Sequence, residues 1–334
     1  MITACETSDI NEWNTVVDDL YGHPLQSFGW GEVKSGYGWT PTRLIFKDSK
    51  QTIGGAQVLR RKLPRPFGSM LYVPRGPFCI EKYRAQVLEA LAAWAKSQDE
   101  KAVELVCEPE WTEQPKGSSK QGWRVTKNHI LLPGTVLIDL TQDPDAMLMA
   151  MPKTRRQDIK KYLRNGFKLE PATTEKDFKA CLGIYKEIAT RDKFNLHVDK
   201  YYHDIWTKMG KYGRLLMVKN PADGEVVAFQ WALVSNGFAF ALFAGVGARG
   251  RKMRINAGAK WQCMQDLHAD GVDKYDLNGL LNDGVDTYKK AFSGEEIHYI
   301  GSLELPLSKL YPVYTKAIPA GKKVLHAVDK IRKK

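Results

Sequence analysis

The chain has 334 residues, of which 43% are hydrophobic and 26% charged, the composition of a packed globular protein with one large or two ordinary domains. Its 50 Lys and Arg against 38 Asp and Glu give a formal charge of +12, which favours a polyanionic partner, although a generally basic surface gives the same number. The five cysteines are widely spaced and no His-Glu-x-x-His motif occurs, so we predict reduced thiols, no disulfide framework and no metal.

The first elements in chain order predict an α/β unit with a largely antiparallel sheet. Strands are expected at 43–46, 53–63 and 69–73, followed by a Pro-Arg-Gly loop, a helix at about 81–97 and a strand at 102–107. Residues 1–14 lack a basic stretch followed by an apolar core, so we predict no signal peptide and a cytoplasmic protein.

The second half repeats this order. After helical segments at about 144–165 and 175–210 come a strand at 214–219, a turn at Asp223-Gly224, a strand pair, a basic loop, a helix at about 256–269 and a strand at 274–277. The strand pair, 226–248, contains no charged residue and is long enough to cross a bilayer. Asn236-Gly237 between β-branched and aromatic runs predicts a buried hairpin instead.

This duplicated order predicts a mixed α+β fold of two tandem domains. It is similar to the order of the acyl-CoA N-acyltransferase (GNAT) fold. The expected domains are 1–140, with 303–334 packing back onto it, and 141–302. The basic tail, 316–334, is a candidate amphipathic helix for tRNA, lipid head groups or the protein's own surface.

Two stretches of the first half hold candidate ligand-binding residues. In LQSFGWGEVKSGYGW (25–39), Lys34 among aromatics that include Trp30 can hold an anion, although aromatics at helical spacing are typical of a core. In VPRGPF (73–78), Pro and Gly flank Arg75 and can present its guanidinium to a phosphate; an exposed Arg in an ordinary turn is the alternative. Glu108, after the strand at 102–107, is a candidate proton acceptor or a plain surface carboxylate.

Two basic stretches follow in the second half. The helix in MPKTRRQDIKKYLRNG (151–166) is rich in Lys and Arg and ends at a plausible Asn165-Gly166 cap, which favours an RNA backbone as its partner. The loop ARGRKMRINAGAKW (248–261) opens a helix where an acetyltransferase would hold the pyrophosphate of CoA on backbone N–H groups. Ala257 stands where that pattern has its first Gly, which weakens the CoA interpretation.

Together LQSFGWGEVK, YVPRGP, the KTRRQDIKKYLRNG helix, YDLNG (275–279) and YKKAFSG…YIGSLELPL resemble the FemXAB family of tRNA-dependent aminoacyltransferases, from about residue 20 to 317. The resemblance implies two GNAT-like domains and transfer of an amino acid from aminoacyl-tRNA, a co-substrate and not a cofactor, to the side-chain amine of a peptidoglycan stem peptide. The length and the lack of heptads predict that the coiled-coil arm of some members is absent.

The resemblance also implies roles for individual residues. Lys289 would stabilise the oxyanion formed from the tRNA ester, Tyr288 would stack the terminal adenine, and Glu108 would lie near the acceptor amine as a weak base. The expected substrate-binding residues are Lys34, Trp30, Arg75, Phe243 and Asp276. The expected tRNA-binding residues are Arg155, Arg156, Lys160, Lys161, Arg251 and Arg254.

Two positions depart from the family pattern, since Tyr288 replaces the usual Phe and Phe243 the usual Tyr; the second exchange loses a hydroxyl contact to substrate. The expected acceptor is UDP-MurNAc-pentapeptide or a lipid-linked muropeptide, reached by a monomer in the cytoplasm or at the inner face of the membrane. A CoA-dependent N-acyltransferase, tRNA-dependent transfer to a peptide antibiotic or other acceptor, and a non-catalytic RNA- or membrane-binding protein remain as alternatives.

Overall fold

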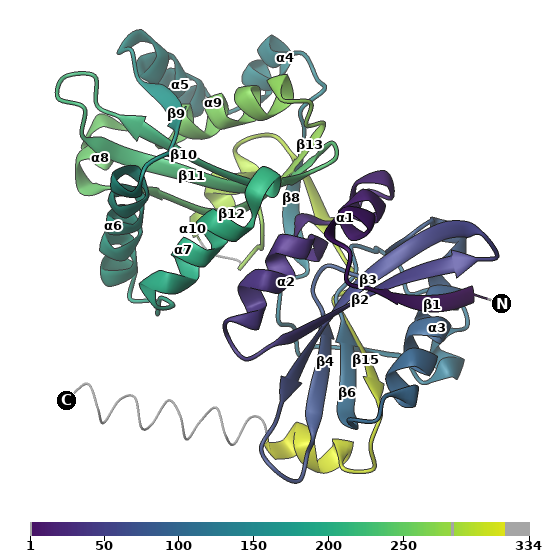
Figure 1. The fold of residues 1–334 in the computed structure, drawn as a ribbon. Helices are drawn as coiled ribbons and strands as arrows, with labels where there is room; N and C mark the ends of the chain where they lie inside the picture. The colour runs from purple at the N-terminus through teal and green to yellow at the C-terminus, as the bar shows by residue number, and fades with distance from the viewer. Residues whose placement is uncertain (1, 282–283, 318–334) are drawn as a thin grey trace. The chain divides into compact units, whose positions relative to one another are not determined.

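The computed structural model describes residues 2–281 and 284–317, which belong to two compact units (Figure 1). Within these described residues, unit 1 consists of Ile2–Asp9, Lys34–His129 and Ile300–Ala317, and unit 2 consists of the described parts of Ile10–Val33 and Ile130–Tyr299. This division differs from the predicted domains at 10–33 and 130–140, which belong to unit 2, and at 300–302, which belong to unit 1. The predicted tail helix lies outside the described residues from 318 onward.

Unit 1 is built on one mixed sheet with the strand order β1-β2-β3-β4-β6-β15-β7, and β5 pairs with β3. The strands are β1 (Ile2–Thr7), β2 (Thr40–Asp48), β3 (Gln51–Lys62), β4 (Ser69–Val73), β5 (Phe78–Cys79), β6 (Ala102–Cys107), β7 (Arg124–Thr126) and β15 (Ser302–Pro306). All neighbours are antiparallel except β4 and β6, which run parallel. Both predicted ligand-binding positions that follow strands in this unit, Arg75 and Glu108, therefore lie at the carboxyl ends of the parallel pair.

Helix α3 (Arg84–Ser97), preceded by the short helix η2 (Glu81–Tyr83), covers the core of unit 1. Its buried residues recur at helical spacing, with Val87, Leu88 and Leu91 fully buried against the sheet, as expected of an amphipathic helix on a sheet face. A short helix η3 (Ser118–Gln121) precedes β7. The helix predicted at 81–97 and the strand predicted at 102–107 are confirmed.

Unit 2 has a second mixed sheet, in the order β14-β8-β13-β12-β11-β10-β9. Its strands are β8 (Gly134–Asp139), β9 (Lys168–Pro171), β10 (Gly213–Lys219), β11 (Val226–Ser235), β12 (Phe238–Val246), β13 (Lys274–Asp276) and β14 (Glu295–His298). β11 and β12 form the predicted hairpin, with Gly237 in the left-handed region. The hairpin predicted for this stretch without charged residues is thus confirmed. Within the described ranges, no helix is long and apolar enough to span a membrane.

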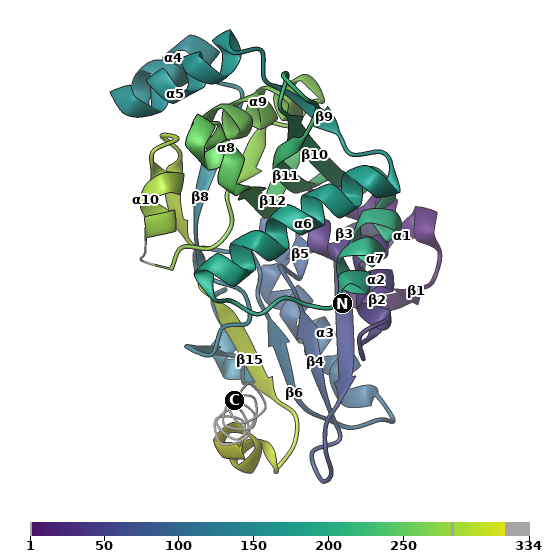
Figure 2. The same ribbon diagram turned by 90° about the vertical axis from the view of Figure 1, so that its left-hand side faces the viewer.

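Helices cover both faces of this sheet. α5 (Lys153–Arg164) and α9 (Asn256–Ala269) pack against each other and bury the main core, whereas α6 (Glu175–Asp192) contacts β11 and β12 on the other face, which it crosses in Figure 2. The remaining helices are α1 (Ile10–Asp19), η1 (Pro24–Gln26), α2 (Phe28–Ser35), α4 (Pro144–Ala150), α7 (Asp199–Lys208), η4 (Gly210–Tyr212), α8 (Ala248–Met253) and α10 (Gly284–Lys290). α6, with 18 residues, is the longest helix of the described ranges, which contain no coiled-coil arm.

Two predicted helical segments are each interrupted. The segment at 144–165 is split between α4 and α5 because Pro152 disfavours a helical conformation at Met151. The segment at 175–210 is split after Asp192, where Lys193 adopts a left-handed conformation with φ of 57° and ends α6. The predicted cap of α5 is confirmed, since Asn165 is the C-cap and Gly166 follows with φ of 73°.

Candidate functional site

Unit 2 contains a pocket where two parallel strands diverge. β12 pairs with β13 only along Phe238–Phe240, after which β12 continues to Val246 while the other chain turns away at Leu277. The opening between them holds a pocket of about 520 Å³, lined by residues of α6, β12, α8, α9, α10 and the turn after β13. That volume lies within the range of small-molecule sites.

Lys289, on α10, lines this pocket. Its ammonium donates hydrogen bonds to the carbonyl oxygens of Asn278, at 2.7 Å, and Gly279, at 2.5 Å. Asn278 has a left-handed φ of 63°, in a turn that presents both carbonyls to the same side chain. Because carbonyl oxygens only accept, the two bonds hold Lys289 as a fixed cation at the pocket wall.

Asp276 fixes the turn that holds Lys289. Its carboxyl group is fully buried, and Oδ1 accepts hydrogen bonds from Thr135 Oγ1 at 2.5 Å and from the Asn278 amide at 2.6 Å. The pocket wall is formed by the neighbouring Leu277 and Asn278. Asp276 is therefore placed to act through the turn, whereas the sequence predicted direct contact with substrate.

Tyr288 also lines the pocket, and its hydroxyl donates to the Asn256 carbonyl at 3.2 Å. The guanidinium of Arg155 lies 4.5 Å from the centroid of the Tyr288 ring. The Phe292 ring packs edge-on against the Tyr288 ring, with 5.2 Å between the two centroids. Removal from water raises the pKa of the Tyr288 phenol. Arg155, predicted to contact tRNA, thus connects α5 to α10 through this ring.

An aromatic wall faces the pocket from β12 and α6. Phe243 lies on β12, with its ring centroid 5.1 Å from that of Tyr185 and 5.8 Å from that of Trp231. Phe243, predicted to bind substrate, and Tyr185 both line the pocket. Such a surface suits a planar or apolar group of a ligand.

The pocket also includes a buried lysine that the sequence analysis did not select. Lys260, on α9, is only 6% exposed, and its Nζ lies 3.0 Å from the buried hydroxyl of Tyr275. Burial, together with the charge of Lys289, lowers the pKa of the Lys260 amine to about 8. The pocket thus contains two lysines in different surroundings.

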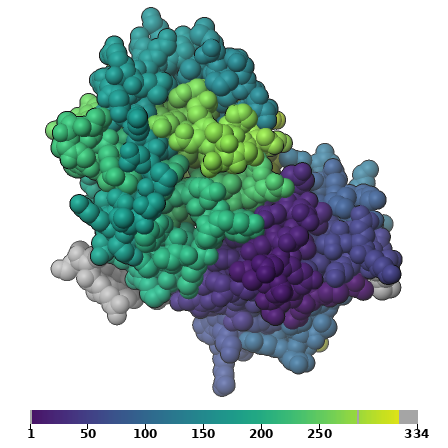
Figure 3. All heavy atoms as spheres, turned by 45° about the horizontal axis from the view of Figure 1, so that its top comes forward, coloured from purple at the N-terminus to yellow at the C-terminus, as the bar shows by residue number. Residues whose placement is uncertain are grey.

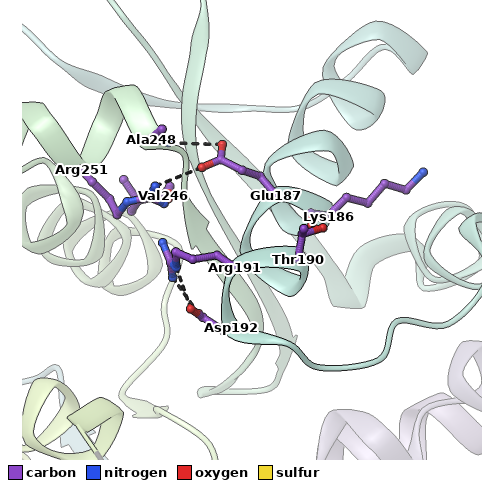
Figure 4. Close-up of polar contacts among 8 residues, drawn as sticks. All are labelled: Lys186, Glu187, Thr190, Arg191, Asp192, Val246, Ala248 and Arg251. Carbon is purple, nitrogen blue, oxygen red and sulfur yellow. Dashed lines mark hydrogen bonds and ion pairs between the residues drawn. The ribbon is translucent and has the colours of Figure 1, made fainter. Parts of the chain in front are cut away.

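At the rim, charged groups from α6 meet the start of α8 (Figure 4). The Glu187 carboxylate accepts a hydrogen bond from the backbone N–H of Ala248 at 3.2 Å and one from Arg251 Nη2 at 3.2 Å. One turn along α6, Arg191 forms a two-point ion pair with Asp192, with both N–O distances 2.7 Å. A carboxylate of the chain itself therefore accepts from the first N–H of α8, which lies in the predicted basic loop 248–261 but six residues before the segment 254–259 that is similar to the CoA pattern.

Most of the other predicted tRNA-binding residues contact the protein itself. Arg156 donates to the carbonyls of Met149 and Met151, and Arg254 pairs with Asp158 at 3.0 Å. Lys160 is exposed and Lys161 is half-buried. In Figure 3 the teal spheres of α4 and α5 adjoin the light-green spheres of the region around α9, which packs against α5.

Unit 1 has a separate polar cluster at the carboxyl ends of β4 and β6. Glu108 is only 3% exposed, and its carboxylate accepts hydrogen bonds from the Tyr72 hydroxyl at 2.5 Å and the Ser302 hydroxyl at 2.7 Å. Burial and the Glu108 charge raise the pKa of Tyr72, and the Arg75 charge opposes them. Glu108 is thus a buried hydrogen-bonded carboxylate, and the surface alternative is wrong.

Arg75 is buried and adopts a left-handed φ of 47°, uncommon for a residue with a side chain. The alternative of an exposed Arg in an ordinary turn is therefore wrong.

Lys34, in the last turn of α2, is half-buried, and burial with the nearby Arg61 charge lowers its pKa to about 8. Arg61, which the sequence analysis missed, also lies 5.2 Å from the Trp39 ring centroid. Trp30 is a core residue, as the core alternative for its aromatic stretch predicted.

Comparisons with known proteins match both halves of the chain. A profile of the FemAB family matches residues 9–131, and a profile described as an acetyltransferase (GNAT) domain matches residues 153–290. A curated relative, a lipid II:glycine glycyltransferase of Staphylococcus epidermidis, is 26% identical over 217 residues, covering 59% of this chain and 51% of that protein. The chain thus matches about half the length of such relatives.

Solved structures confirm the fold. The crystal structure of FemX superposes with a TM-score of 0.82 at 18% identity, covering 92% of this chain and 98% of that one. A tandem GNAT protein from the clavulanic acid biosynthesis pathway superposes with a TM-score of 0.54 at 12% identity, covering 92% and 98%. The predicted mixed α+β fold of two tandem GNAT-like domains is confirmed, and residues 9–131 match the FemAB family.

Proposed function

We propose that the chain transfers an amino acid from aminoacyl-tRNA to the side-chain amine of a muropeptide precursor, in formation of a peptidoglycan interpeptide bridge. The observation that carries this proposal is the Lys289 ammonium, fixed by two carbonyls at the wall of the unit 2 pocket. The name of the curated relatives, lipid II:glycine glycyltransferase, supports the same reaction class.

The chemistry needs a fixed cation more than it needs a strong base. An aminoacyl ester is already activated, so attack by an amine gives a tetrahedral intermediate whose oxygen carries negative charge. A preorganised ammonium beside that oxygen lowers the barrier, because the ammonium is already oriented before charge develops. Lys289 has this orientation from the Asn278 and Gly279 carbonyls.

The donor end of tRNA fits the unit 2 pocket. Its aromatic wall, with Phe243 and Tyr185, offers stacking surface for the terminal adenine, and the exposed Lys160 with Lys161 on α5 supplies charge for the RNA backbone. Arg155 has the different role of supporting the Tyr288 ring.

For the acceptor we propose the polar cluster of unit 1. Lys34, Arg61 and Arg75 supply positive charge for the diphosphate that nucleotide-linked and lipid-linked muropeptides share. The names of the relatives make the lipid-linked form the preferred acceptor and glycine the first donor to test. Access to a lipid-linked acceptor requires peripheral contact with the membrane surface, which a monomer can make.

The Glu187 contact counts against a CoA-dependent acyltransferase. Its carboxylate already accepts from the Ala248 N–H and from Arg251, so a pyrophosphate at that loop would meet a negative charge. Ala257, in place of the Gly of the CoA pattern, adds a side chain where backbone should approach phosphate. The tRNA-dependent reaction is therefore preferred.

The test combines purified protein, a charged tRNA pool, each labelled amino acid, and either a nucleotide-linked or a lipid-linked pentapeptide with lysine at its third position. The expected product has the mass of the acceptor plus one amino-acid residue, and ribonuclease prevents its formation. Lys289→Met should lower the transfer rate by roughly 100-fold or more, as loss of one oxyanion donor does. Lys290→Met is the matched control, because Lys290 follows Lys289 on α10 but its ammonium pairs with Glu296 of β14 at 2.6 Å. No mass gain with any acceptor, or full activity of Lys289→Met, contradicts the proposal.

A further inference from the structure

Resting on the proposed function, a second lysine in the pocket has a role of its own. We propose that the Lys260 amine, held by the Tyr275 hydroxyl at the pocket wall, takes the proton from the attacking amine and passes it to the departing ribose oxygen. Lys260 and Lys289 line the same pocket from different helices, α9 and α10.

The reaction leaves a proton to be moved. The acceptor ammonium first loses one proton to solvent and attacks the ester carbon as a neutral amine, which forms the C–N bond. The nitrogen then carries a positive charge and must lose a second proton before the C–O bond to ribose breaks. That proton moves to Lys260 and from Lys260 to the ribose 3′ oxygen, so the amide and the free tRNA hydroxyl form with no co-reactant.

The surroundings of the two lysines assign them different tasks. Two carbonyl oxygens accept from Lys289, which suits a group that stays charged. Lys260 is almost completely buried on the apolar side of α9, and its hydrogen-bond partner is a hydroxyl, which can donate as well as accept. A hydroxyl partner suits an amine that alternates between two protonation states.

The groups around Lys260 are consistent with this alternation. Burial and the Lys289 charge lower its pKa to about 8, while Cys263 acts in the opposite direction. Burial raises the pKa of Tyr275 well above its usual range, with Cys263, Tyr288 and Asp276 contributing, so the phenol keeps its proton. Tyr275 can therefore donate to the neutral Lys260 amine and accept from the charged one.

The deciding experiment is the pH profile of single-turnover transfer from pre-charged tRNA to the acceptor, for the wild type and for Lys260→Met. We expect the wild-type rate to show an inflection near the pKa of about 8 given by its surroundings. Lys260→Met should lose this inflection and about 100-fold in rate near pH 8, the usual contribution of a general base. Tyr275→Phe should move the inflection and keep part of the rate. Lys290→Met, which removes an ammonium next to Lys289, should keep both.

A direct titration provides a second readout. Trace acetylation of the intact protein with a limiting reagent, followed by peptide mass spectrometry, gives the protonation midpoint of the Lys260 amine without any turnover. A midpoint near the ordinary lysine value of about 10.4 overturns the proposal. The proposal is also overturned if the wild type is active and the inflection in its pH–rate profile persists in Lys260→Met. If the wild type transfers nothing to any acceptor, the proposed function itself fails, an outcome distinct from these two.

Discussion

Replacement of Lys260 by methionine is expected to change how the stability of the protein depends on pH. Burial lowers the pKa of this amine from 10.5 to about 8 in the folded state. At about 1.4 kcal/mol per pKa unit, the buried ammonium costs the folded state roughly 3 kcal/mol below pH 8. Methionine has a similar length and carries no charge, so it removes this cost.

The sign follows from proton counting. Between pH 8 and 10.5 the unfolded chain still holds the lysine proton whereas the folded chain has released it, so the wild type gains stability as the pH rises through this window. The variant lacks that gain. Loss of the hydrogen bond to Tyr275 costs the variant about 1–3 kcal/mol, because it leaves a buried hydroxyl without this partner, but that cost is the same at both pH values.

Urea denaturation of both proteins at pH 7 and at about pH 9.5 separates these two effects, since only the ionisation depends on pH. The free energy of unfolding of Lys260→Met minus that of the wild type should fall by roughly 2 kcal/mol between the two pH values. All other titrating groups cancel in this difference. An unchanged difference would falsify the assignment of a depressed pKa to Lys260 and remove the support it gives to the proton-transfer role.

Three further predictions use other parts of the chain. Binding of a nucleotide-linked muropeptide, measured by calorimetry, should weaken as the pH rises through about 8, because Lys34 loses its charge there. Lys34→Met should abolish this pH dependence of the affinity, and a pH dependence that persists in the variant contradicts the role of Lys34 in binding. Acetyl-CoA should not bind the wild type, because the Glu187 carboxylate lies at the start of the basic loop and Ala257 replaces the Gly of the CoA pattern; a micromolar Kd in the same calorimeter would refute that reasoning. Burial, with the charge of Glu304, raises the pKa of Glu104 to about 7, so the wild type should lose roughly 3 kcal/mol as the pH rises from 4.5 to 7. Glu104→Gln should remove this loss, measured by urea denaturation at pH 5 and pH 8. The same change in the free energy of unfolding between these pH values for the variant and the wild type would contradict the prediction.

The hairpin of β11 and β12 could be predicted because its signals are local. Asn-Gly turn chemistry and β-branched runs fix both strands and the turn within about twenty residues. The helix at 256–269 is defined in the same way. The interruptions at Met151 and after Asp192 were not predicted, although Pro152 is a local signal for the first of them.

Lys260 was missed for a different reason. A lysine in a helix usually faces water, so Lys260 was not among the predicted site residues. Ala257, Met264 and Leu267 are buried on the same helix at spacings of three, four and seven residues from Lys260. A lysine within such an apolar stripe indicates a buried amine, so the sequence did contain the signal. What it did not contain is the partner, because Tyr275 reaches Lys260 only through the pairing of β13 with β12.

The placement of both lysines follows from a single feature of the fold. Parallel strands β12 and β13 separate after Phe240 and Asp276, and the turn that leaves β13 exposes the two carbonyls that hold Lys289. The same strand brings Tyr275 under α9, where it contacts Lys260. Adjacent residues of one short strand therefore act on different lysines, since Tyr275 bonds Lys260 and Asp276 braces the turn for Lys289. A change in the register of β13 would disturb both lysines together, so their functions should be lost as a pair in variants of this strand and separately in variants of the lysines themselves.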